Sequence, residues 1–397
     1  MARATAGTGY TENHIPRIRK GAFLVIRIVC FWLLVAAPVF ADITAAPPAG
    51  HSTLRAVTLA DRLEHPWGMA FLPDGSILVS ERPGRLRLVT PDGTLSPALD
   101  GLPDIVATGQ GGLFDVALHP QFAQNRWVYF SYSAGSRLTR QLGTEVARGR
   151  LGDGRLDDVE VIFRASPKAG GGRHFGGRLL FDHQGLLYIS LGERGDKERA
   201  QDLGDHNGSV IRIRDDGSVP DDNPFADRPG ALPEIYSYGH RNVQGLALAA
   251  DGETVWALEH GPQGGDEVNR LQPGLNYGWP VITYGVNYGI GTRVGEGTAK
   301  AGMEQPVYYW DPSIAPSGMT FYQGDRFPQW RGNLLVGALK YRLLSRLELS
   351  DDKVVAEEQL LQNALGRIRD VQMGPDGYVY LLTDEDPGRL VRLEPQP

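Results

Sequence analysis

Short apolar segments alternate with turns along most of the chain, and one such unit recurs six times. Each unit has a polar or glycine start, an apolar strand, a turn that is often of the Pro-Asp-Gly kind, and a second apolar strand. The copies begin at Gly68, Phe114, Gly177, Gln244, Gly318 and Arg369. Further strand-like segments, such as 84–89 and 342–349, lie between them. No apolar segment after residue 42 has the helical period over an ordinary helix length, so the pattern predicts an all-β protein.

A hairpin that recurs every 45 to 75 residues or so cannot bury its apolar face alone and has to stack on its neighbours. The repeat therefore predicts a six-bladed β-propeller of four-stranded antiparallel blades. Residues 54–59 have no hairpin of their own, so we expect them to close the ring as the outer strand of the last blade, beside 389–393. The long inserts 196–232 and 284–304 are expected to form loops on a rim, where binding residues are commonly found.

The N-terminal segment has the pattern of an export signal. Basic residues precede an apolar run from Ile28, and small residues in Val39-Phe40-Ala41 fit a signal-peptidase site. We expect residues 1–41 to be a signal peptide and 42–397 a single propeller domain in the periplasm, with 42–53 as a flexible lead-in. The alternative is an uncleaved membrane anchor, for which the apolar run is short. Cleavage removes Cys30, the only cysteine, so the mature chain would have no disulfide and no thiolate metal site.

The composition is that of a globular protein, because 22% of the 397 residues are charged and 41% are hydrophobic. Signal cleavage takes five basic residues and one acidic residue from totals of 40 and 47. The 35 basic and 46 acidic residues that remain give a net charge of −11. A surface of this sign argues against nucleic acid or an anionic membrane as partner.

Polar residues recur at the start of the repeated units. They are Gln110, Arg173-His174, Arg241-Asn242, Pro316-Ser317 and Arg367 with Arg369. Equivalent positions of a propeller face the same end of its central channel, so we expect these side chains to converge. A histidine there is a candidate general base because its unperturbed pKa lies near neutrality. Taken alone, a histidine such as His174 is more often a hydrogen-bonded surface or core residue.

Four cationic residues would surround one mouth of this acidic protein: Arg241, Lys340, Arg367 and Arg369. They suit a pocket for a small polyanion, because arginine binds carboxylates through two parallel hydrogen bonds. The alternative is that they pair with nearby acids such as Asp370 or Glu348.

Two polar runs, 239–242 and 259–267, flank the apolar segments 246–248 and 255–258. If these segments are neighbouring strands, both runs lie at strand ends and face one site. The second run, EHGPQGGDE, is rich in oxygen ligands and glycine, which suits calcium. It is not an EF-hand loop, so a solvated acidic turn remains an alternative.

Nine short motifs occur in order between about residues 63 and 393. They are GQGGL at 109–113, HFGGRL at 174–179, GHRNVQGL at 239–246, EHGP at 259–262, GDEVN at 265–269, NYGWP at 276–280, APS at 315–317, LK at 339–340 and RIRD at 367–370. Taken together they make the chain resemble the glucose/sorbosone dehydrogenase family of soluble quinoprotein sugar dehydrogenases, and within it the aldose sugar dehydrogenases.

The resemblance implies a pyrroloquinoline quinone (PQQ) cofactor across the channel mouth, joined to a calcium ion. His174 would be the base that takes the anomeric hydroxyl proton. The residues that would hold the cofactor are Gln110, Arg241, Asn242, Ser313, Lys340, Arg367 and Arg369. Gly261 and Pro262 would offer carbonyl oxygens to the cofactor-bound calcium, which acts as a Lewis acid. A second calcium would be held by Glu267, Tyr277, Gly302 and Glu304.

The function implied is oxidation of an aldose at C1 to its lactone. Electrons would leave to a separate acceptor, a quinone or a periplasmic cytochrome, and the protein would be a monomer or a homodimer. Two alternatives stay open. A metal-dependent lactonase on a similar propeller would need carboxylates and amides from several blades at a channel metal, without the cations. A non-catalytic propeller would bind a glycan or a protein, because fold alone does not determine function.

Overall fold

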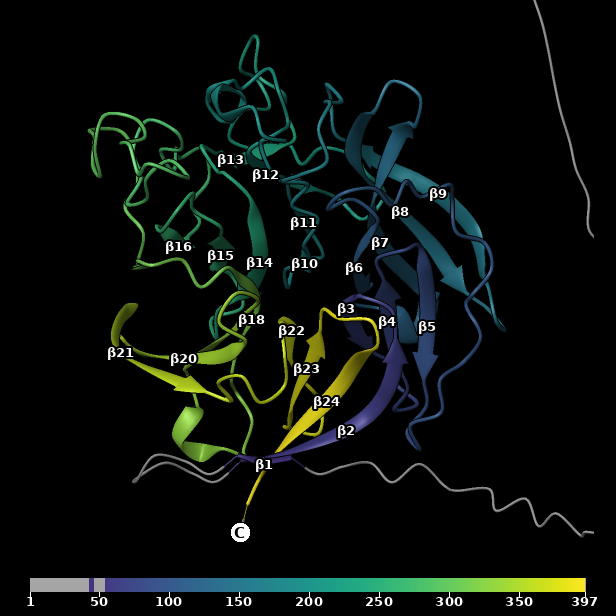
Figure 1. The fold of residues 1–397 in the computed structure, drawn as a ribbon. Helices are drawn as coiled ribbons and strands as arrows, with labels where there is room; N and C mark the ends of the chain where they lie inside the picture. The colour runs from purple at the N-terminus through teal and green to yellow at the C-terminus, as the bar shows by residue number, and fades with distance from the viewer. Residues whose placement is uncertain (1–42, 46–53, 397) are drawn as a thin grey trace, which may run out of the picture. The chain divides into compact units, whose positions relative to one another are not determined.

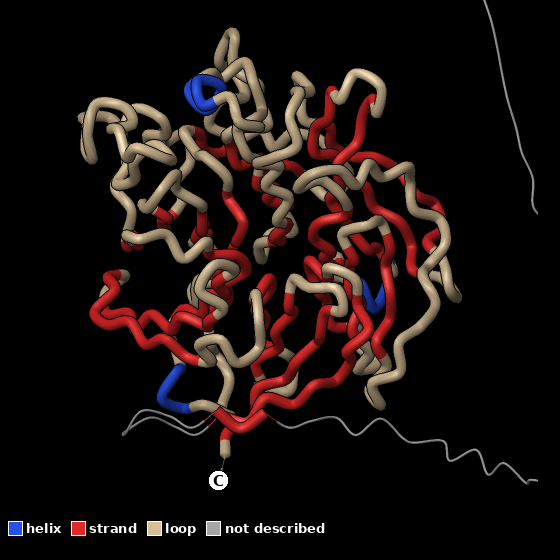
Figure 2. The backbone as a smooth tube through the Cα atoms, viewed as in Figure 1, coloured by secondary structure: helices blue, strands red, loops and turns tan. Residues whose placement is uncertain are grey.

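The computed structural model describes residues 43–45 and 54–396, and almost all regular structure in them is β-strand (Figures 1 and 2). Blade 1 consists of β3 (Pro66–Phe71), β4 (Ile77–Glu81) and β5 (Arg85–Val89). Blade 2 consists of β6 (Leu113–Leu118), β7 (Trp127–Ser136), β8 (Gln141–Leu151) and β9 (Leu156–Arg164). Blade 3 consists of β10 (Leu179–Phe181), β11 (Leu187–Ser190), β12 (Ser209–Ile213) and β13 (Ile235–Tyr238).

The second half of the chain repeats this antiparallel order. Blade 4 consists of β14 (Val243–Leu248), β15 (Val255–Glu259), β16 (Asp266–Arg270) and β17 (Tyr308–Trp310). Blade 5 consists of β18 (Pro316–Phe321), β19 (Leu334–Ala338), β20 (Leu343–Ser350) and β21 (Lys353–Leu360). Blade 6 consists of β22 (Ile368–Met373), β23 (Val379–Thr383), β24 (Gly388–Pro395) and β2 (Leu54–Leu63), with β1 (Ile43–Ala45) on its outer edge. The short helices are α1 (Phe122–Asn125), η1 (Lys197–Gln201) and η2 (Pro328–Trp330).

The six-bladed β-propeller predicted from the repeat is confirmed. The first strands of the blades contact one another in a closed series, β3–β6–β10–β14–β18–β22–β3. Blade 1 has three strands and a single further bridge, Val89 to Leu95, at its outer edge. The predicted closure of the ring is also confirmed, because β2 pairs with β24 in the register Ala56 opposite Leu393. A seam of this kind joins the two ends of the domain through a full strand ladder.

Apolar faces of neighbouring blades pack together to form the core. Leu78 of blade 1 shares one buried cluster with Val116 and Phe130 of blade 2. Trp256 of blade 4 shares another with Val336 of blade 5. Each blade therefore buries its apolar residues against the next, as the repeat requires.

The prediction of a rim loop was only partly right for one of the two inserts. Residues 196–232 contain η1 and the whole of β12, the third strand of blade 3. All five residues of β12 are buried, and their β-branched sequence SVIRI is typical of a strand. The insert 284–304 does lie between β16 and β17 without a strand of its own. Of the predicted lead-in 42–53, residues 43–45 form β1; the other lead-in residues and the predicted signal peptide lie outside the described residues.

A buried ion cluster fills the middle of the channel. The third residue of the first strand in blades 2 and 6 is an aspartate, Asp115 and Asp370, and the equivalent residue of blade 3 is Arg178. Arg178 donates to both carboxylates, at 3.2 Å and 2.8 Å. Blades 1, 4 and 5 have glycine at this position, and a Cβ at Gly68 would lie 2.2 Å from an Asp115 oxygen. Glycine thus leaves the space that the charged side chains occupy.

Within the described residues, no helix is long and apolar enough to cross a lipid bilayer.

Candidate active site

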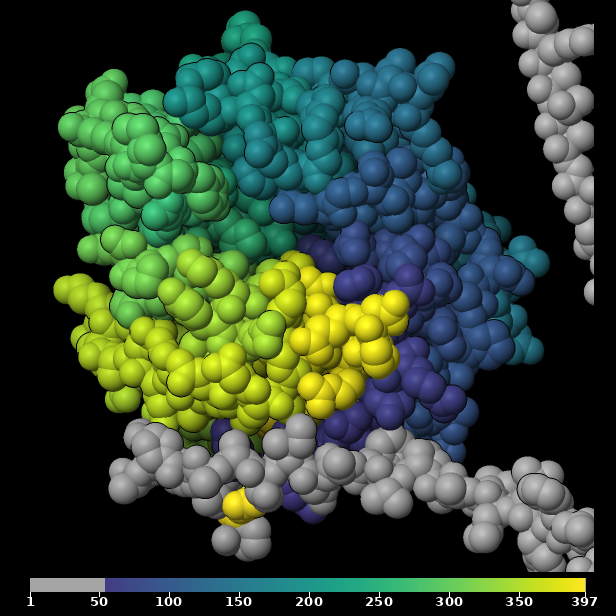
Figure 3. All heavy atoms as spheres, in the orientation of Figure 1, coloured from purple at the N-terminus to yellow at the C-terminus, as the bar shows by residue number. Residues whose placement is uncertain are grey.

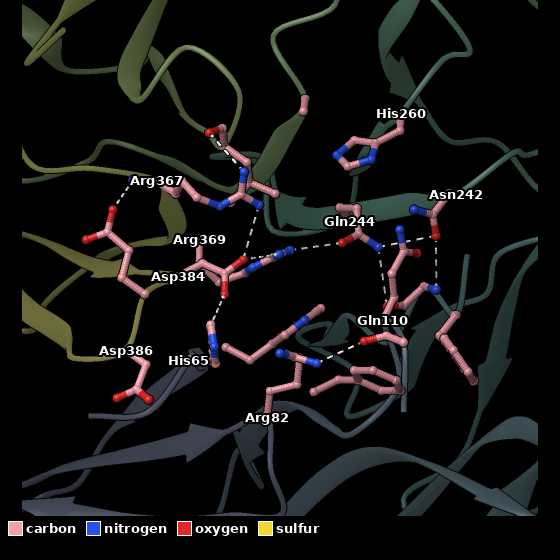
Figure 4. A pocket seen from close by; sticks show the side chains of 18 of the residues that line it. His65, Arg82, Gln110, Asn242, Gln244, His260, Arg367, Arg369, Asp384 and Asp386 are labelled. Carbon is pink, nitrogen blue, oxygen red and sulfur yellow. Dashed lines mark hydrogen bonds and ion pairs between the residues drawn. The ribbon is translucent and has the colours of Figure 1, made fainter. Parts of the chain in front are cut away.

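A pocket of about 720 Å³ opens at one end of the channel, and all six blades contribute to its wall (Figure 4). Segments from the start, middle and end of the described chain meet around it in the space-filling view (Figure 3). Four of the predicted site residues line it together: Gln110, Asn242, Arg367 and Arg369. The expected convergence of the unit starts is therefore confirmed for these four.

The two polar runs of blade 4 meet at this same end. The two apolar segments are neighbouring strands, because β14 pairs with β15 in the register Ala247 opposite Trp256, which brings residues 239–242 beside the segment after β15. The Arg241 backbone N–H donates to Glu259 at 2.7 Å, and its guanidinium donates to the His260 carbonyl at 3.2 Å. The two runs form one continuous wall.

His174 does not itself line the pocket but directly precedes the lining residues Phe175 and Gly176, and a carboxylate holds one of its ring nitrogens. Its Nδ1 lies 2.5 Å from Oε2 of Glu193, and its backbone N–H donates to the Gln110 side chain at 2.8 Å. A carboxylate only accepts hydrogen bonds, so Nδ1 carries the proton and the Nε2 lone pair is available. Nε2 has no hydrogen-bond partner among the described residues.

The electrostatic surroundings keep this histidine neutral. Burial lowers the pKa of His174 below its ordinary value, and the hydrogen bond and charge of Glu193 oppose that shift. The nearby Arg241 and Arg173 lower the pKa further. A neutral imidazole with a free Nε2 is the form that a general base needs.

Two arginines of blade 6 share one acid rather than standing free. Arg367 and Arg369 both donate to Asp384, at 3.3 Å and 2.9 Å. Burial alone would raise the pKa of Asp384, but the Arg369 and Arg367 guanidinium groups hold it well below its usual range. The alternative that the cationic residues pair with nearby acids is thus correct for Arg367 and Arg369. Their partner is Asp384, whereas Asp370 pairs with Arg178.

Two of the four predicted cationic residues keep a buried nitrogen without a hydrogen-bond partner in the described part of the chain. Arg241 and Arg369 are at least nine-tenths buried, and the Nε of each has no hydrogen-bond partner among the described residues. A buried guanidinium nitrogen without an acceptor costs free energy. Arg369 lines the mouth and Arg241 lines a small neighbouring cavity, so each guanidinium has a nitrogen that could still bind an anion at that place.

The other three predicted cofactor residues, Arg241, Lys340 and Ser313, do not line the pocket. Lys340 is exposed, follows the lining residue Leu339, and its ammonium lies 5.2 Å from the Tyr341 ring centroid. The Ser313 hydroxyl accepts from the Ala315 backbone N–H at 3.2 Å.

Several lining residues were missed by sequence reasoning, namely His65, Trp67, Phe114, Gln244, His260 and Asp384. Trp67, Phe114 and Gln244 occupy the second position of their strands, as Arg369 does, so a residue-by-residue alignment of the repeats could have found them. Asp384 follows β23 and has no equivalent in that register, so nothing in the repeat pointed to it.

His260 is fixed in a different state from His174. Its Nε2 lies 2.6 Å from the Pro316 carbonyl oxygen, so this nitrogen is the protonated donor. Burial lowers the pKa of His260 to about 3, and the charges of Arg241 and Arg369 act in the same direction. His260 is therefore a neutral wall residue that anchors blade 4 to blade 5.

Three of the six predicted metal residues line a small cavity behind the mouth. Gly261, Glu267 and Tyr277 line it together with Glu259. The Asn269 side-chain amide donates to both Glu259 and Glu267, at 3.2 Å each, while its Oδ1 is buried without a partner. Burial and the neighbouring Glu259 charge raise the pKa of Glu267 above its ordinary value.

The remaining predicted metal residues are placed as follows. Pro262 is buried, and among the described residues neither its carbonyl nor that of Gly261 accepts a hydrogen bond. The Glu304 backbone N–H donates to the Asn276 carbonyl at 2.8 Å, which brings this segment next to Tyr277. Gly302 lies in the same loop, with open space around its Cα. Within the described ranges, no three His, Cys, Asp or Glu side chains are grouped so as to hold a metal by themselves.

Comparison with known proteins agrees with the fold. The sequence model of the family described as glucose/sorbosone dehydrogenase matches residues 63–392. The chain belongs to this family. It is 44% identical to the aldose sugar dehydrogenase of Escherichia coli (strain K12), across 96% of this chain and 100% of that protein.

Two solved structures extend the agreement. The chain is similar to the apo-form of the soluble aldose sugar dehydrogenase of Escherichia coli, with a TM-score of 0.84, 46% identity, and coverage of 87% of this chain and 100% of the other. It is also similar to the PQQ-bound form of the aldose sugar dehydrogenase of Streptomyces coelicolor, with a TM-score of 0.73, 31% identity, and coverage of 88% and 100%. The glucose/sorbosone dehydrogenase relatives make this chain a sugar-oxidising enzyme, as the sequence predicted.

Proposed function

We propose that this family member is a PQQ- and calcium-dependent aldose dehydrogenase that oxidises an aldose at C1 to its lactone. One observation carries the proposal: a neutral histidine with a free Nε2 is hydrogen-bonded through its backbone to Gln110 of the mouth, which is also lined by the buried Arg369 with its unpartnered Nε. The structure of a PQQ-bound relative supports the choice of cofactor.

The residues present fit a small anionic quinone. PQQ has three carboxylates. The unpartnered Nε of Arg241 belongs to the small cavity behind the mouth, and that of Arg369 belongs to a residue that lines the mouth pocket. Gln110, Asn242 and Arg367 line the same pocket, and Lys340 and Ser313 lie beside it as further contacts. Arginine forks match carboxylates in geometry and charge. When bound, PQQ supplies the ortho-quinone that accepts the hydride from C1.

His174 takes the proton in this proposal. As the C1–H bond of the sugar breaks and the C1 carbonyl forms, the anomeric hydroxyl gives its proton to Nε2 of His174. The resulting imidazolium is stabilised by the Glu193 carboxylate at Nδ1. Glu193 also fixes the orientation and the tautomer of the His174 ring, as a carboxylate bound to the far nitrogen of a catalytic histidine usually does.

Calcium fits the oxygen ligands behind the mouth. The carbonyl oxygens of Gly261 and Pro262 are free to bind a cofactor-bound ion. A second ion would use Glu267 and Tyr277 with Gly302 and Glu304, and the buried unpartnered Oδ1 of Asn269 lies next to Glu267. Calcium accepts carbonyl, amide and carboxylate oxygens together, so it does not need a cluster of acids.

The acceptor and the location follow from the same hypothesis. Cys30 is the only cysteine, so the chain has no c-type haem attachment motif and electrons would pass to a separate quinone or periplasmic cytochrome. The predicted signal peptide would deliver the protein to the periplasm, as a monomer or a homodimer.

The lactonase alternative is disfavoured by the channel itself. A channel metal would need free carboxylates from several blades, but Asp115 and Asp370 are both engaged by Arg178.

The proposal is tested by adding PQQ and calcium, separately and together, to the apoprotein. We expect aldose-dependent dye reduction and lactone formation only when both are present, and loss of activity on calcium chelation. No activity across a panel of aldoses with both additions would contradict the proposal.

Replacing Glu193 with glutamine tests the histidine–carboxylate pair. Glu193 raises the pKa of His174, so its removal lowers that pKa and moves the acidic limb of the kcat profile to lower pH. We expect kcat at neutral pH to fall about tenfold or more, because a weaker base accepts the proton less readily.

Glu198→Gln is the matched control, because Glu198 lies five residues away with a side chain that is 76% exposed. An unchanged pH profile in Glu193→Gln would show that Glu193 does not act on the base.

A further inference from the structure

A second groove, of about 580 Å³, lies beside the mouth and is not used by the proposed function. It is lined by residues 169–173, 194–196 and Arg199. Its floor is largely glycine: a Cβ at Gly170 or Gly171 would meet no atom closer than 3.6 Å. The groove therefore has room for a ligand above exposed backbone.

Three arginines surround this groove in different states. Arg173 is exposed, and its side chain has no hydrogen bond or ion pair among the described residues. A Cβ at Gly195 would lie 2.5 Å from the Arg173 Nε, so the absence of a side chain there lets the guanidinium lie across the loop. Arg199 is engaged by Asp205 at 2.6 Å. The only acid in the groove wall is Asp196.

Arg194 is the buried member of the set. Its guanidinium lies over the Phe175 ring at 3.3 Å from the centroid and donates to the carbonyls of Arg173 and Gly171. Its Nε is buried without a partner. Burial lowers the pKa of Arg194 to about 10, which leaves the group charged at neutral pH. It contributes a fixed positive charge beneath the groove.

The groove and the mouth share a wall. The Gly172 carbonyl accepts from the Gln110 backbone N–H at 2.7 Å, and Gln110 lines the mouth. Phe175, on which Arg194 rests, also lines the mouth. Arg173 immediately precedes His174, close enough for its charge to act on that imidazole. A sugar with C1 at His174 therefore has the groove as its neighbour.

We propose that this groove is a subsite for an anionic group, a carboxylate or a phosphate, on the sugar that the enzyme oxidises. The inference rests on the proposed function and narrows its substrate class to acidic aldoses such as uronic acids and sugar phosphates. Arg173 supplies the free guanidinium that binds the anion, and Arg194 supplies the charge behind it.

Two measurements test the subsite. The first compares kcat/KM for glucuronic acid and glucose 6-phosphate with that for glucose, at low and high salt. We expect the anionic sugars to be favoured about fivefold or more at low salt, with the preference shrinking as salt screens the charges. Preference for only one of the two would identify the anion as carboxylate or phosphate.

The variant is Arg173→Gln, and the control is Arg62→Gln at an arginine whose side chain is 85% exposed. We expect Arg173→Gln to abolish the preference ratio and Arg62→Gln to keep it. Equal kcat/KM for the neutral and anionic sugars in the unmodified enzyme, or an unchanged ratio in Arg173→Gln, would overturn the subsite.

The second measurement is calorimetric titration of glucuronic acid and glucose into the apoprotein without PQQ. We expect tighter binding of glucuronic acid, weakened in Arg173→Gln. Because the titration needs no turnover, it separates the dehydrogenase proposal from the subsite proposal. An inactive protein that still binds glucuronic acid more tightly than glucose refutes only the dehydrogenase proposal. An active enzyme whose apoprotein shows no preference refutes only the subsite.

Discussion

Replacing His174 with alanine is expected to lower kcat for aldose oxidation by about 10²- to 10⁴-fold, the usual contribution of a positioned general base. The reason is geometric. Nε2 of His174 is the free, unprotonated nitrogen at the mouth, while His260 has its Nε2 committed to the Pro316 carbonyl. His65 also lines the mouth, with its Nδ1 3.1 Å from Oδ1 of Asp384, and it stays in place in this variant; the prediction is that it does not replace His174. The measurement is steady-state dye reduction with saturating PQQ, calcium and sugar.

His183→Ala is the matched control, because His183 lines the pocket at the other end of the first strands rather than the mouth. It should keep kcat within about twofold, as an uninvolved exposed residue does. If His174→Ala retained activity within the same range, the assignment of the base would be wrong.

Replacing Arg178 with methionine is expected to destabilise the fold by about 3–5 kcal/mol at pH 8, the range for breaking a buried ion pair on one side. Arg178 is 2% exposed and is hydrogen-bonded to two buried carboxylates. Without it, Asp115 and Asp370 would face each other across the channel with no cation between them. Urea denaturation gives the change in free energy of unfolding.

The loss should depend on pH. Burial raises the pKa of Asp115 and of Asp370 above their ordinary values, and Arg178 opposes this shift in both. In the variant the pKa values of both aspartates rise further in the folded state. Between the unfolded and folded pKa values the folded state therefore binds more protons than the unfolded state, and its stability falls as pH rises through that range. The deficit should be smaller at pH 5 than at pH 8.

Arg155→Met provides the comparison, because Arg155 forms an exposed pair with Asp157 that should be worth less than about 1 kcal/mol. A loss for Arg178→Met that is equally small, or independent of pH, would contradict this account of the channel.

The fold was predictable because a hairpin unit that recurs six times has few ways to bury its faces. The closing strand was predictable for the same reason: residues 54–63 are apolar on one face and have no hairpin partner in sequence. β12 was missed because a five-residue strand inside a polar insert gives a weak period of its own. Its buried β-branched residues were the available signal.

The site was predictable where the repeat register or the family resemblance applied. Gln110, Asn242 and Arg369 were found in this way, and they line one pocket. The partners of the charged residues were not predictable. Successive residues of a strand point in different directions, so Arg369 meets Asp384 while its neighbour Asp370 meets Arg178. Glu193 was missed because only the folded chain brings it to His174, 19 residues away in sequence.

If this mouth holds PQQ and His174 takes the proton there, the absorption spectrum of the cofactor should report both. The most direct measurement is anaerobic absorption spectroscopy of the apoprotein titrated with PQQ in calcium, followed by addition of an aldose. The account predicts saturation at one PQQ per chain and a sugar-dependent change in the bound cofactor's spectrum. It also predicts that His174→Ala binds PQQ equally well but shows no such change at the same time points. A protein that does not bind PQQ, or a bound spectrum that no aldose alters in the unmodified enzyme, would contradict it.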